Sequence, residues 1–408
     1  MKRRAYIFLP ILGEEIPAAV IEHHIGSGSE RYTFRYGERY LDNPHAFPID
    51  PRQLPLVDRQ LEFPRMPLAI QDAGPDDFGR YLYAAVNGSP PESELDYHLG
   101  NGNSIGAMTF SSSLDVPKNN QLYTTFSSIS EIVDAFQQLE RKKTLTPQMK
   151  SLMTPSLKLG GARPKALLND GSEEWILKFE RKDDIFNIPM AEHATMLAAG
   201  NVGIRCAESQ VIDVEGHKVF ATRRFDRDIN IKHHYLSAFT LLGGDNINPK
   251  TYYEDFSYQK ISNILKMSSP WPQQDRQELF TRMLFNVAVS NRDDHLKNHG
   301  FLLSQSPSQY RLSPCFDIVP ATHSATQAIS IGVQGPKATM ENALSQANQF
   351  QIPEDKIGYH VDMVSEGAKS IPGIAESLGM RKAEVEYLND AIEKNFTPDT
   401  SKSFSPSM

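Results

Sequence analysis

The sequence predicts an α+β protein with a β-rich N-terminal subdomain over about residues 1–150 and a second domain over about residues 151–400. Strand-forming runs separated by Pro and Gly fill the first hundred residues. Two hairpin patterns then flank one helical pattern between residues 165 and 222, and from about residue 236 the apolar residues recur mainly at helical spacing. We therefore expect a second domain whose second lobe is mainly helical.

Composition excludes several classes of protein. The chain has 408 residues, 39% of them hydrophobic and 23% charged, as in globular proteins of two domains or more. A net charge of −8 argues against nucleic-acid binding by bulk electrostatics. The two cysteines, Cys206 and Cys315, exclude a disulfide framework and a CxxC metal site. No run of about 18 apolar residues occurs, so we expect a cytoplasmic protein without a membrane span.

The N-terminal subdomain is predicted from local signals. Residues 5–9 and 32–36 are rich in strand formers. Pro10 interrupts the first apolar run, which argues for a strand rather than a secretory leader. Residues 132–139 have apolar side chains at helical spacing behind Ser130, which we expect to cap this helix. The boundary with the second domain is predicted near residues 140–155.

The second domain opens with hairpins around a helix. A first hairpin is predicted from residues 165–168 and 175–179, and a helix from Pro189 to Gly200. A second hairpin is predicted at residues 211–222, with its turn at Glu215-Gly216. In the later, helical part Leu279, Met283 and Val287 form one apolar stripe.

A glycine-rich segment precedes the first of these hairpins. It reads LGGARPK and contains Gly160, Gly161, Ala162, Arg163 and Lys165. Paired glycines let backbone N–H groups approach an anion, and the basic residues add positive charge. Taken alone the pattern is weak, because two glycines before a strand usually form only a turn.

Lys178 lies among large apolar residues in the strand WILKF. Alternation puts Trp175, Leu177 and Phe179 on one face and Lys178 on the other, facing either solvent or a cleft. A solvated lysine is the more common case. Glu192, on the helix that follows, is placed to pair with Lys178 and hold its amine for phosphate oxygens.

The segment NRDDHLKNHG carries the sharpest signal. Asp293 and Asn298 bracket a D-x-x-x-x-N span that can aim a carboxylate at a hydroxyl and an amide at a metal. A hairpin from residues 301–303 and 310–312 should return Asp317 beside Asn298. Two oxygen ligands suit Mg²⁺, so the set indicates an ATP- and Mg²⁺-dependent phosphotransferase. Taken singly, these residues also fit a helix-terminal charge pair and a turn.

Two rival patterns carry less weight. His295 and His299 are four residues apart, as on a zinc-binding helix, but the Glu of metalloprotease chemistry is missing. Gly100, Gly102 and Gly106 are similar to a dinucleotide fingerprint, but the third glycine is displaced and no clear strand precedes them.

Several segments resemble the HipA family of toxin kinases, the serine/threonine kinases of bacterial toxin–antitoxin systems. The motifs are LGGARPKALL, WILKF, AEHATMLAAG, RRFDRD, LFNVAVSNRDDHLKNHGFLL and YRLSPCFDIVPA. RYTFRYGERYL and PLAIQDAGPDDFGR resemble the family's N-terminal subdomain. The resemblance extends over about residues 5–395 and implies a kinase-like second domain.

The resemblance also implies roles for individual residues. Asp293 is the expected catalytic base, Asn298 and Asp317 the expected Mg²⁺ ligands, and Lys178, supported by Glu192, an expected contact to ATP phosphates. Loop 159–165 is expected to cover the nucleotide. The other expected ATP-binding residues are Arg223, Arg224 and Phe225 at the adenine, together with His295 and Lys297.

The expected partner is a HipB-like helix-turn-helix antitoxin, so DNA would be bound only indirectly. Expected substrates are translation components such as an aminoacyl-tRNA synthetase, notably glutamyl-tRNA synthetase. The family usually has a Ser before its glycine pair, where autophosphorylation inactivates the kinase, but this chain has Lys158 there. Ser156 is the candidate replacement. A small-molecule kinase and an inactive corepressor remain as alternatives.

Overall fold

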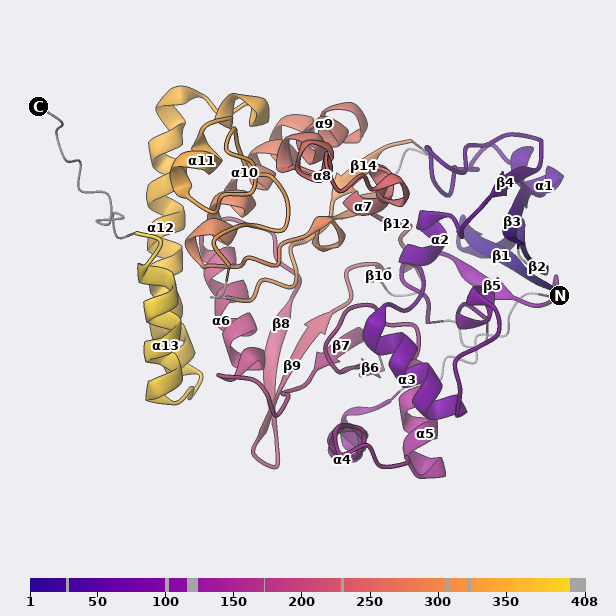
Figure 1. Ribbon diagram of the computed structural model, residues 1–408, viewed down its shortest axis with the longest axis horizontal. Helices are drawn as coiled ribbons and strands as arrows, with labels where there is room; N and C mark the ends of the chain where they lie inside the picture. The colour runs from indigo at the N-terminus through magenta and orange to yellow at the C-terminus, as the bar shows by residue number, and fades with distance from the viewer. Residues whose placement is uncertain are drawn as a thin grey trace, which may run out of the picture.

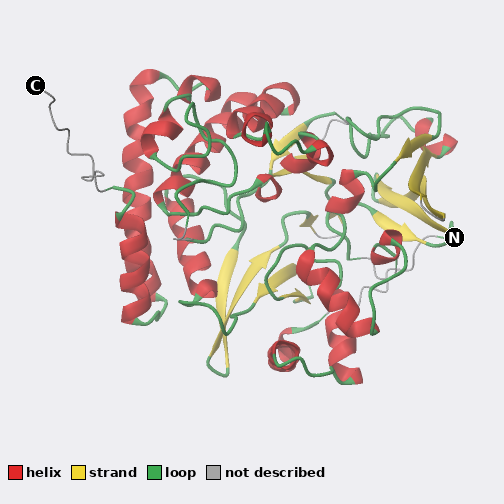
Figure 2. Ribbon diagram, in the orientation of Figure 1, coloured by secondary structure: helices red, strands yellow, loops and turns green. Residues whose placement is uncertain are grey.

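The computed structural model describes residues 1–26, 29–99, 103–115, 124–171, 173–228, 231–304, 308–320 and 324–396. The described residues form an α+β protein, as predicted (Figure 1, Figure 2). An N-terminal sheet lies at one end of the molecule and a helical lobe at the other, with a second sheet between them (Figure 2). No helix within these ranges is both long and apolar enough to cross a membrane.

The N-terminal sheet has five antiparallel strands in the order β4-β3-β2-β1-β5. Alternate side chains of its strands point to one buried face, among them Ile7 and Leu9. The strands predicted at residues 5–9 and 32–36 are both confirmed. The strands are β1 (Lys2–Ile11), β2 (Glu14–Gly26), β3 (Ser29–Tyr36), β4 (Leu61–Phe63) and β5 (Thr109–Ser111), and this part of the chain also contains α1 (Glu38–Leu41), α2 (Leu68–Asp72) and α3 (Asp77–Asn87), the last of which packs on α5 (Pro147–Met153).

The second sheet contains both predicted hairpins, in the order β6-β7-β9-β8. Its strands are β6 (Lys165–Asn169), β7 (Glu174–Lys178), β8 (Ser209–Val214) and β9 (His217–Arg223). Glu215 and Gly216 both have positive φ, 52° and 87°, as the predicted tight turn between β8 and β9 requires. Asn169 is the last residue of β6, and Asp170 and Gly171 follow it in the connection to β7, whereas Ser172 falls outside the described residues.

Helix α6 (Ile188–Asn201) connects the two hairpins and confirms the helix predicted at residues 189–200. Its first turn is set by Pro189 and by Asn187, whose side chain accepts a hydrogen bond from the Met190 N–H. Most of the side chains of α6 are buried between the sheet and the helical lobe.

Helices from before residue 157 cover the opposite face of the second sheet. Trp175, Leu177 and Phe179 are buried there in one cluster with side chains of α4 (Ile129–Glu140) and α5 (Pro147–Met153). The rings of Phe136 and Phe179 are 4.5 Å apart. Since α4 and α5 pack on the sheet that follows them, the boundary predicted near residue 150 stays a prediction.

The predicted cap of α4 is wrong. The helix begins at Ile129, and Ser130 lies in its first turn, where its Oγ donates to Glu215 Oε1 at 3.1 Å. A 3-10 turn at Phe126–Ser128 leads directly into α4 and makes its own backbone hydrogen bonds. This turn replaces the side-chain cap that the sequence pattern predicted.

The helical lobe surrounds α10, where the predicted stripe of Leu279, Met283 and Val287 is buried. Three further strands line its inner edge in the order β12-β13-β14, and the predicted hairpin of residues 301–303 and 310–312 is confirmed, with Phe301 opposite Leu312. The segment between β14 and Asp317 makes a single β-bridge, which pairs Cys315 with Cys206. The elements are α7 (Ala238–Leu241), α8 (Tyr252–Asp255), α9 (Tyr258–Ser268), α10 (Pro272–Ala288), α11 (Met340–Leu344), α12 (Glu354–Ser377) and α13 (Lys382–Glu393), with β10 (Arg227–Asp228), β11 (Ile231–Lys232), β12 (Tyr235–Ser237), β13 (Gly300–Leu303) and β14 (Tyr310–Leu312).

Candidate active site

Lys178 lies at the junction of the second sheet and the helical lobe. Its Nζ is 2.5 Å from Glu192 Oε1 on α6 and 2.5 Å from Asp317 Oδ1 in the segment after β14. Burial alone would lower the pKa of Lys178, but the carboxylates of Asp317 and Glu192 outweigh burial and raise it. The structure thus brings together three predicted residues from three separate elements, with Lys178 as their fixed positive charge.

Asp317 has a backbone conformation that is unusual for a residue with a side chain. Its φ of 59° lies in the left-handed region, which costs a non-glycine residue roughly 1 kcal/mol or more. Burial would raise the pKa of Asp317, but Lys178 and Lys165 hold it well below its usual range. Asp317 is therefore an ionised carboxylate whose Oδ1 is held by Lys178.

The loop after α10 places Asp293 and Asn298 side by side. The His295 N–H donates to the Asp293 carbonyl at 2.8 Å, and Asn298 Nδ2 donates to the same oxygen at 3.2 Å. The neighbouring Asp294 is buried and accepts hydrogen bonds from the Tyr258 hydroxyl and from His299 Nε2. Asp294 anchors the loop, so Asp293 is the carboxylate left for the cleft.

The electrostatics of Asp293 suit a proton acceptor. Burial raises its pKa, and the charges of Asp317 and Asp294 add to this, while His295 opposes them. The influence of Asp317 on Asp293 indicates that the two carboxylates lie near each other. His295 faces the same site and has a buried Nδ1 without a hydrogen-bond partner among the described residues.

The donor set fits Mg²⁺ better than zinc. Asn298 uses its nitrogen on the Asp293 carbonyl, which leaves its amide oxygen as an acceptor, and Asp317 supplies a carboxylate. Mg²⁺ takes few protein ligands and prefers such oxygens. Within the described ranges no cluster of three or more His, Cys, Asp or Glu forms a metal site. His299 contacts Asp294 through Nε2, and its Nδ1 has no hydrogen-bond partner among the described residues.

The glycine-rich loop covers Lys165 rather than lying open. Lys165 Nζ donates to the Gly160 carbonyl at 2.9 Å, and burial together with Lys178 lowers the pKa of Lys165 to about 8. Gly161 has a φ of 91°, and a Cβ built on it would lie 2.0 Å from Lys165 Nζ. The flexible end of Lys165 could move away from a side chain at position 161, so the positive φ is what explains this glycine.

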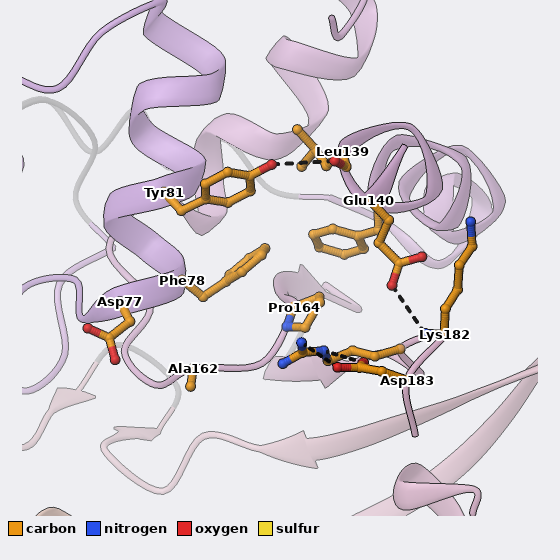
Figure 3. Close-up of a pocket in the computed structure, with 11 residues that line it drawn as sticks. Asp77, Phe78, Tyr81, Leu139, Glu140, Ala162, Pro164, Lys182 and Asp183 are labelled. Carbon is orange, nitrogen blue, oxygen red and sulfur yellow. Dashed lines mark hydrogen bonds and ion pairs between the residues drawn. The ribbon is translucent and has the colours of Figure 1, made fainter. Parts of the chain in front are cut away.

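Arg163 and Ala162 lie on the outer side of this loop. Arg163 pairs with Asp184 and also donates to the Phe179 carbonyl, so its guanidinium serves the sheet rather than a ligand. Ala162 and Pro164 line a cavity of about 490 Å³ (Figure 3). The rest of its lining is Asp77, Phe78, Tyr81, Phe136, Leu139, Glu140, Arg181, Lys182 and Asp183. This cavity is separate from the predicted catalytic residues, none of which lines it.

The three residues predicted at the adenine differ in their surroundings. Arg223 is paired at the end of β9 with Glu173 at 2.9 Å. The Arg224 guanidinium is buried and pairs with Glu174 and Asp226, so its side chain is not available to a nucleotide in this structure. Phe225 packs its ring 5.4 Å from that of Phe316, next to Asp317. Of the three, only Phe225 borders the cleft residues.

Ser156 and Lys158, which precede the glycines, are both buried. Ser156 Oγ accepts a hydrogen bond from the Leu167 N–H at 3.0 Å, and Lys158 Nζ donates to the His98 carbonyl at 2.7 Å. Burial lowers the pKa of Lys158 to about 7. Modification of Ser156 would require this segment to leave β6, so autophosphorylation at Ser156 stays a prediction.

Sequence reasoning missed Asp76, whose carboxylate enters the site from the N-terminal subdomain. Its Oδ1 is 2.8 Å from Nζ of Lys297, a predicted ATP-binding residue. The two residues are 221 positions apart. The segment PDDFGR was available as a signal, but an acidic residue after Pro75 and before a helix reads as an ordinary helix cap.

Comparison with known proteins adds a family to this geometry. Residues 157–371, more than half of the chain, match the HipA-like C-terminal domain. The serine/threonine-protein kinase toxin HipA of Shewanella oneidensis is 24% identical over 273 residues, which are 57% of this chain and 61% of that protein. A protein of Haemophilus influenzae named as a candidate kinase is 29% identical over 139 residues, 31% of this chain and 40% of that protein. The chain thus matches less than two thirds of either relative.

The fold agrees with this match. A solved complex of HipA, HipB and operator DNA from Shewanella oneidensis contains a chain that superposes with a TM-score of 0.63 and 17% identity. The superposition covers 96% of both chains, so the likeness includes the N-terminal subdomain. From the matched domain and the shared fold, we conclude that this chain belongs to the HipA family.

Proposed function

We propose that this protein is an ATP- and Mg²⁺-dependent serine/threonine protein kinase. The observation that carries the proposal is Lys178, held at 2.5 Å from both Glu192 and Asp317, while Asp317 in turn acts on the charge of Asp293, whose carbonyl accepts from Asn298. Phosphoryl transfer depends on such an arrangement of fixed charges more than on covalent chemistry. The curated relatives named as kinases support the same activity.

Each residue has a defined task in this proposal. Lys178 and Lys165 supply positive charge to phosphate oxygens under the glycine-rich loop, with Lys297 and His295 at the side of the catalytic loop. Asn298 and Asp317 would hold Mg²⁺, which neutralises charge on the transferred phosphoryl group. Asp293 accepts the proton of the acceptor hydroxyl, a task that its raised pKa favours.

We also propose that the kinase is a toxin paired with a HipB-like antitoxin that binds DNA. The support is the neighbouring structure, in which HipA is bound with HipB and operator DNA. A translation component such as an aminoacyl-tRNA synthetase is the proposed substrate. Mass spectrometry of proteins retained by an inactive Asp293→Asn variant would test both the partner and the substrate.

The activity is tested by Asp293→Asn. Removing the proton acceptor should lower kcat about 10²- to 10⁴-fold, measured as transfer of labelled phosphate from ATP to protein. The variant should still bind ATP and Mg²⁺, because Asp293 is proposed neither as a contact to the ATP phosphates nor as a metal ligand. In a thermal shift, ligand at a hundredfold its Kd should stabilise both proteins by roughly 2.7 kcal/mol.

Asp183→Asn is the matched control, since Asp183 is 70% exposed and paired only with Arg181 among the described contacts. Equal phosphate transfer by Asp293→Asn and the wild type would contradict the assignment of the base. Transfer to small hydroxyl compounds but not to protein would favour a small-molecule kinase. A wild type that neither transfers phosphate nor is stabilised by ATP would favour the inactive corepressor.

A further inference from the structure

Asp76 belongs to the N-terminal subdomain but reaches the catalytic loop. We propose that Asp76 is a positioning residue of the kinase site, which fixes the ammonium of Lys297 at the phosphate end of the cleft and ties it to the glycine-rich loop. This inference rests on the proposed kinase activity. It assigns the N-terminal subdomain a direct part in phosphoryl transfer.

Asp76 stands at a backbone position where its carboxylate could cap a helix, but the carboxylate does not do so. Asp76 is the N-cap residue of α3, and Asp is among the best capping side chains, contributing about 1 kcal/mol. Yet its carboxylate makes no capping hydrogen bond. It turns instead to Lys297, with Oδ1 and Nζ 2.8 Å apart. A carboxylate that forgoes a local cap for a contact 221 residues away indicates a role in the site.

The second carboxylate oxygen of Asp76 faces the glycine-rich loop. A Cβ built on Gly160 would lie 3.4 Å from Asp76 Oδ2. Asp76 therefore lies between the loop expected to cover the nucleotide and the loop that carries Asp293. Lys297 is thereby held beside the glycine-rich loop, which the proposed function places over the nucleotide.

The helix that begins after Asp76 also fixes the glycine-rich loop. The Phe78 N–H donates to the Gly161 carbonyl at 3.1 Å. A Cβ built on Gly79 would lie 2.5 Å from the Leu159 carbonyl oxygen, so α3 and the loop approach at backbone distance. One turn of chain thus holds both sides of the site, the loop through Phe78 and Gly79 and Lys297 through Asp76.

The ion pair between Asp76 and Lys297 is expected to contribute little to the stability of the fold. The side chains of Asp76 and Lys297 are 38% and 43% exposed, and such pairs contribute only about 0–1 kcal/mol. The pair instead fixes the position of the Lys297 ammonium, because lysine has a flexible four-carbon side chain that would otherwise sample many conformations. The ring of Phe239, 5.7 Å from Lys297 Nζ, confines the ammonium from a second direction.

The test is Asp76→Asn, with Asp76→Glu and Asp77→Asn as comparisons. Asn caps helices as well as Asp, so the fold and the melting temperature should be retained. We expect kcat/KM for ATP to fall about 10- to 100-fold, because a small misplacement of a catalytic group has effects of this size. Asp76→Glu should restore part of the loss. Asp77→Asn should match the wild type, since Asp77 is an exposed residue at the outer cavity (Figure 3).

A double-mutant cycle with Lys297→Ala separates positioning from a structural role. If Asp76 acts through Lys297, adding Asp76→Asn to Lys297→Ala should cause no further loss of kcat/KM. Additive losses would overturn the proposal, as would wild-type kinetics or tighter ATP binding in Asp76→Asn. If the wild type itself shows neither phosphate transfer nor stabilisation by ATP, the proposed function fails and the role of Asp76 fails with it.

Discussion

Two clusters of charge, one buried and one partly exposed at Asp317, lie at opposite ends of β7, and they are built differently. The cleft cluster (Lys178, Glu192, Asp317) has one cation between two carboxylates and therefore a net charge of −1. The hinge cluster (Glu174, Arg224, Asp226, Arg227) has two cations and two carboxylates, whose charges cancel. An excess of negative charge is what a site for Mg²⁺ requires, whereas a neutral cluster needs no ligand.

Hydrogen bonding separates the two clusters further. In the hinge cluster the Ser104 carbonyl accepts from both guanidinium groups, and Asp226 Oδ2 accepts from the Gly106 N–H at 2.7 Å. These bonds join the N-terminal subdomain to the end of β9. In the cleft cluster the hydrogen bonds among the described residues run only between side chains. The comparison suggests that a charge cluster tied to backbone serves the fold, whereas one tied only to side chains can rearrange around a ligand.

The largest expected effect is on the hinge cluster, by Asp226→Ala. Removing this carboxylate leaves two buried guanidinium groups without their shared partner, which should lower the free energy of unfolding by about 3–5 kcal/mol. Urea denaturation measures this. Arg224 and Arg227 outweigh burial and hold the pKa of Asp226 below its usual range, so this stabilisation is present at neutral pH and is lost in acid. A loss below about 1 kcal/mol would show that the cluster is not structural.

Asp317→Asn tests the cleft cluster. Unlike Asp226→Ala, it should lower phosphate transfer strongly and the free energy of unfolding only slightly. Phosphate transfer should fall about a hundredfold or more, roughly 3 kcal/mol, because a proposed Mg²⁺ ligand loses its charge. The free energy of unfolding should change by only about 1 kcal/mol, since the side chain is 39% exposed and Lys178 keeps Glu192. Kinase assays at several Mg²⁺ concentrations check the expected loss of activity, and urea denaturation checks the expected small change in stability. A stability loss as large as that of Asp226→Ala would remove the distinction between the clusters.

The smallest expected effect is that of Arg223→Ala, beside the hinge cluster. Arg223 pairs with Glu173, and the two side chains are 34% and 29% exposed, so the variant should lose about 0–1 kcal/mol of stability. Urea denaturation of Arg223→Ala and Asp226→Ala under the same conditions compares the two losses of stability. The KM for ATP of the same variant tests the nucleotide contact that the sequence resemblance implies for Arg223.

Local signals made the hairpins and α6 predictable. Glu215-Gly216 marks a tight turn, and Pro189 with Gly200 marks the two ends of a helix almost to the residue. The order of the elements was also enough to predict that Glu192 would meet Lys178, since α6 follows β7 directly. Short connections leave few alternatives for such neighbours.

Contacts between distant segments could not be predicted in the same way. The family resemblance implies a place for Arg224 at the adenine, which stays a prediction, but nothing in the sequence indicated that Ser104 and Asp226 bind its guanidinium. The same limit applies to Asp76, whose partner lies on another domain. The prediction that Ser130 caps α4 is wrong for a different reason. A 3-10 turn precedes the helix and provides the backbone hydrogen bonds at its start.

The cover of the second sheet by α4 and α5 has a practical consequence. Both helices precede residue 157, where the match to the HipA-like domain begins. A polypeptide trimmed to that match would expose Trp175, Leu177 and Phe179 to water, at a cost on the order of 1.5–3 kcal/mol for each large apolar side chain. The smallest fragment that can fold therefore has to start well upstream of the recognisable sequence signature, and shorter ones should be recovered as aggregates.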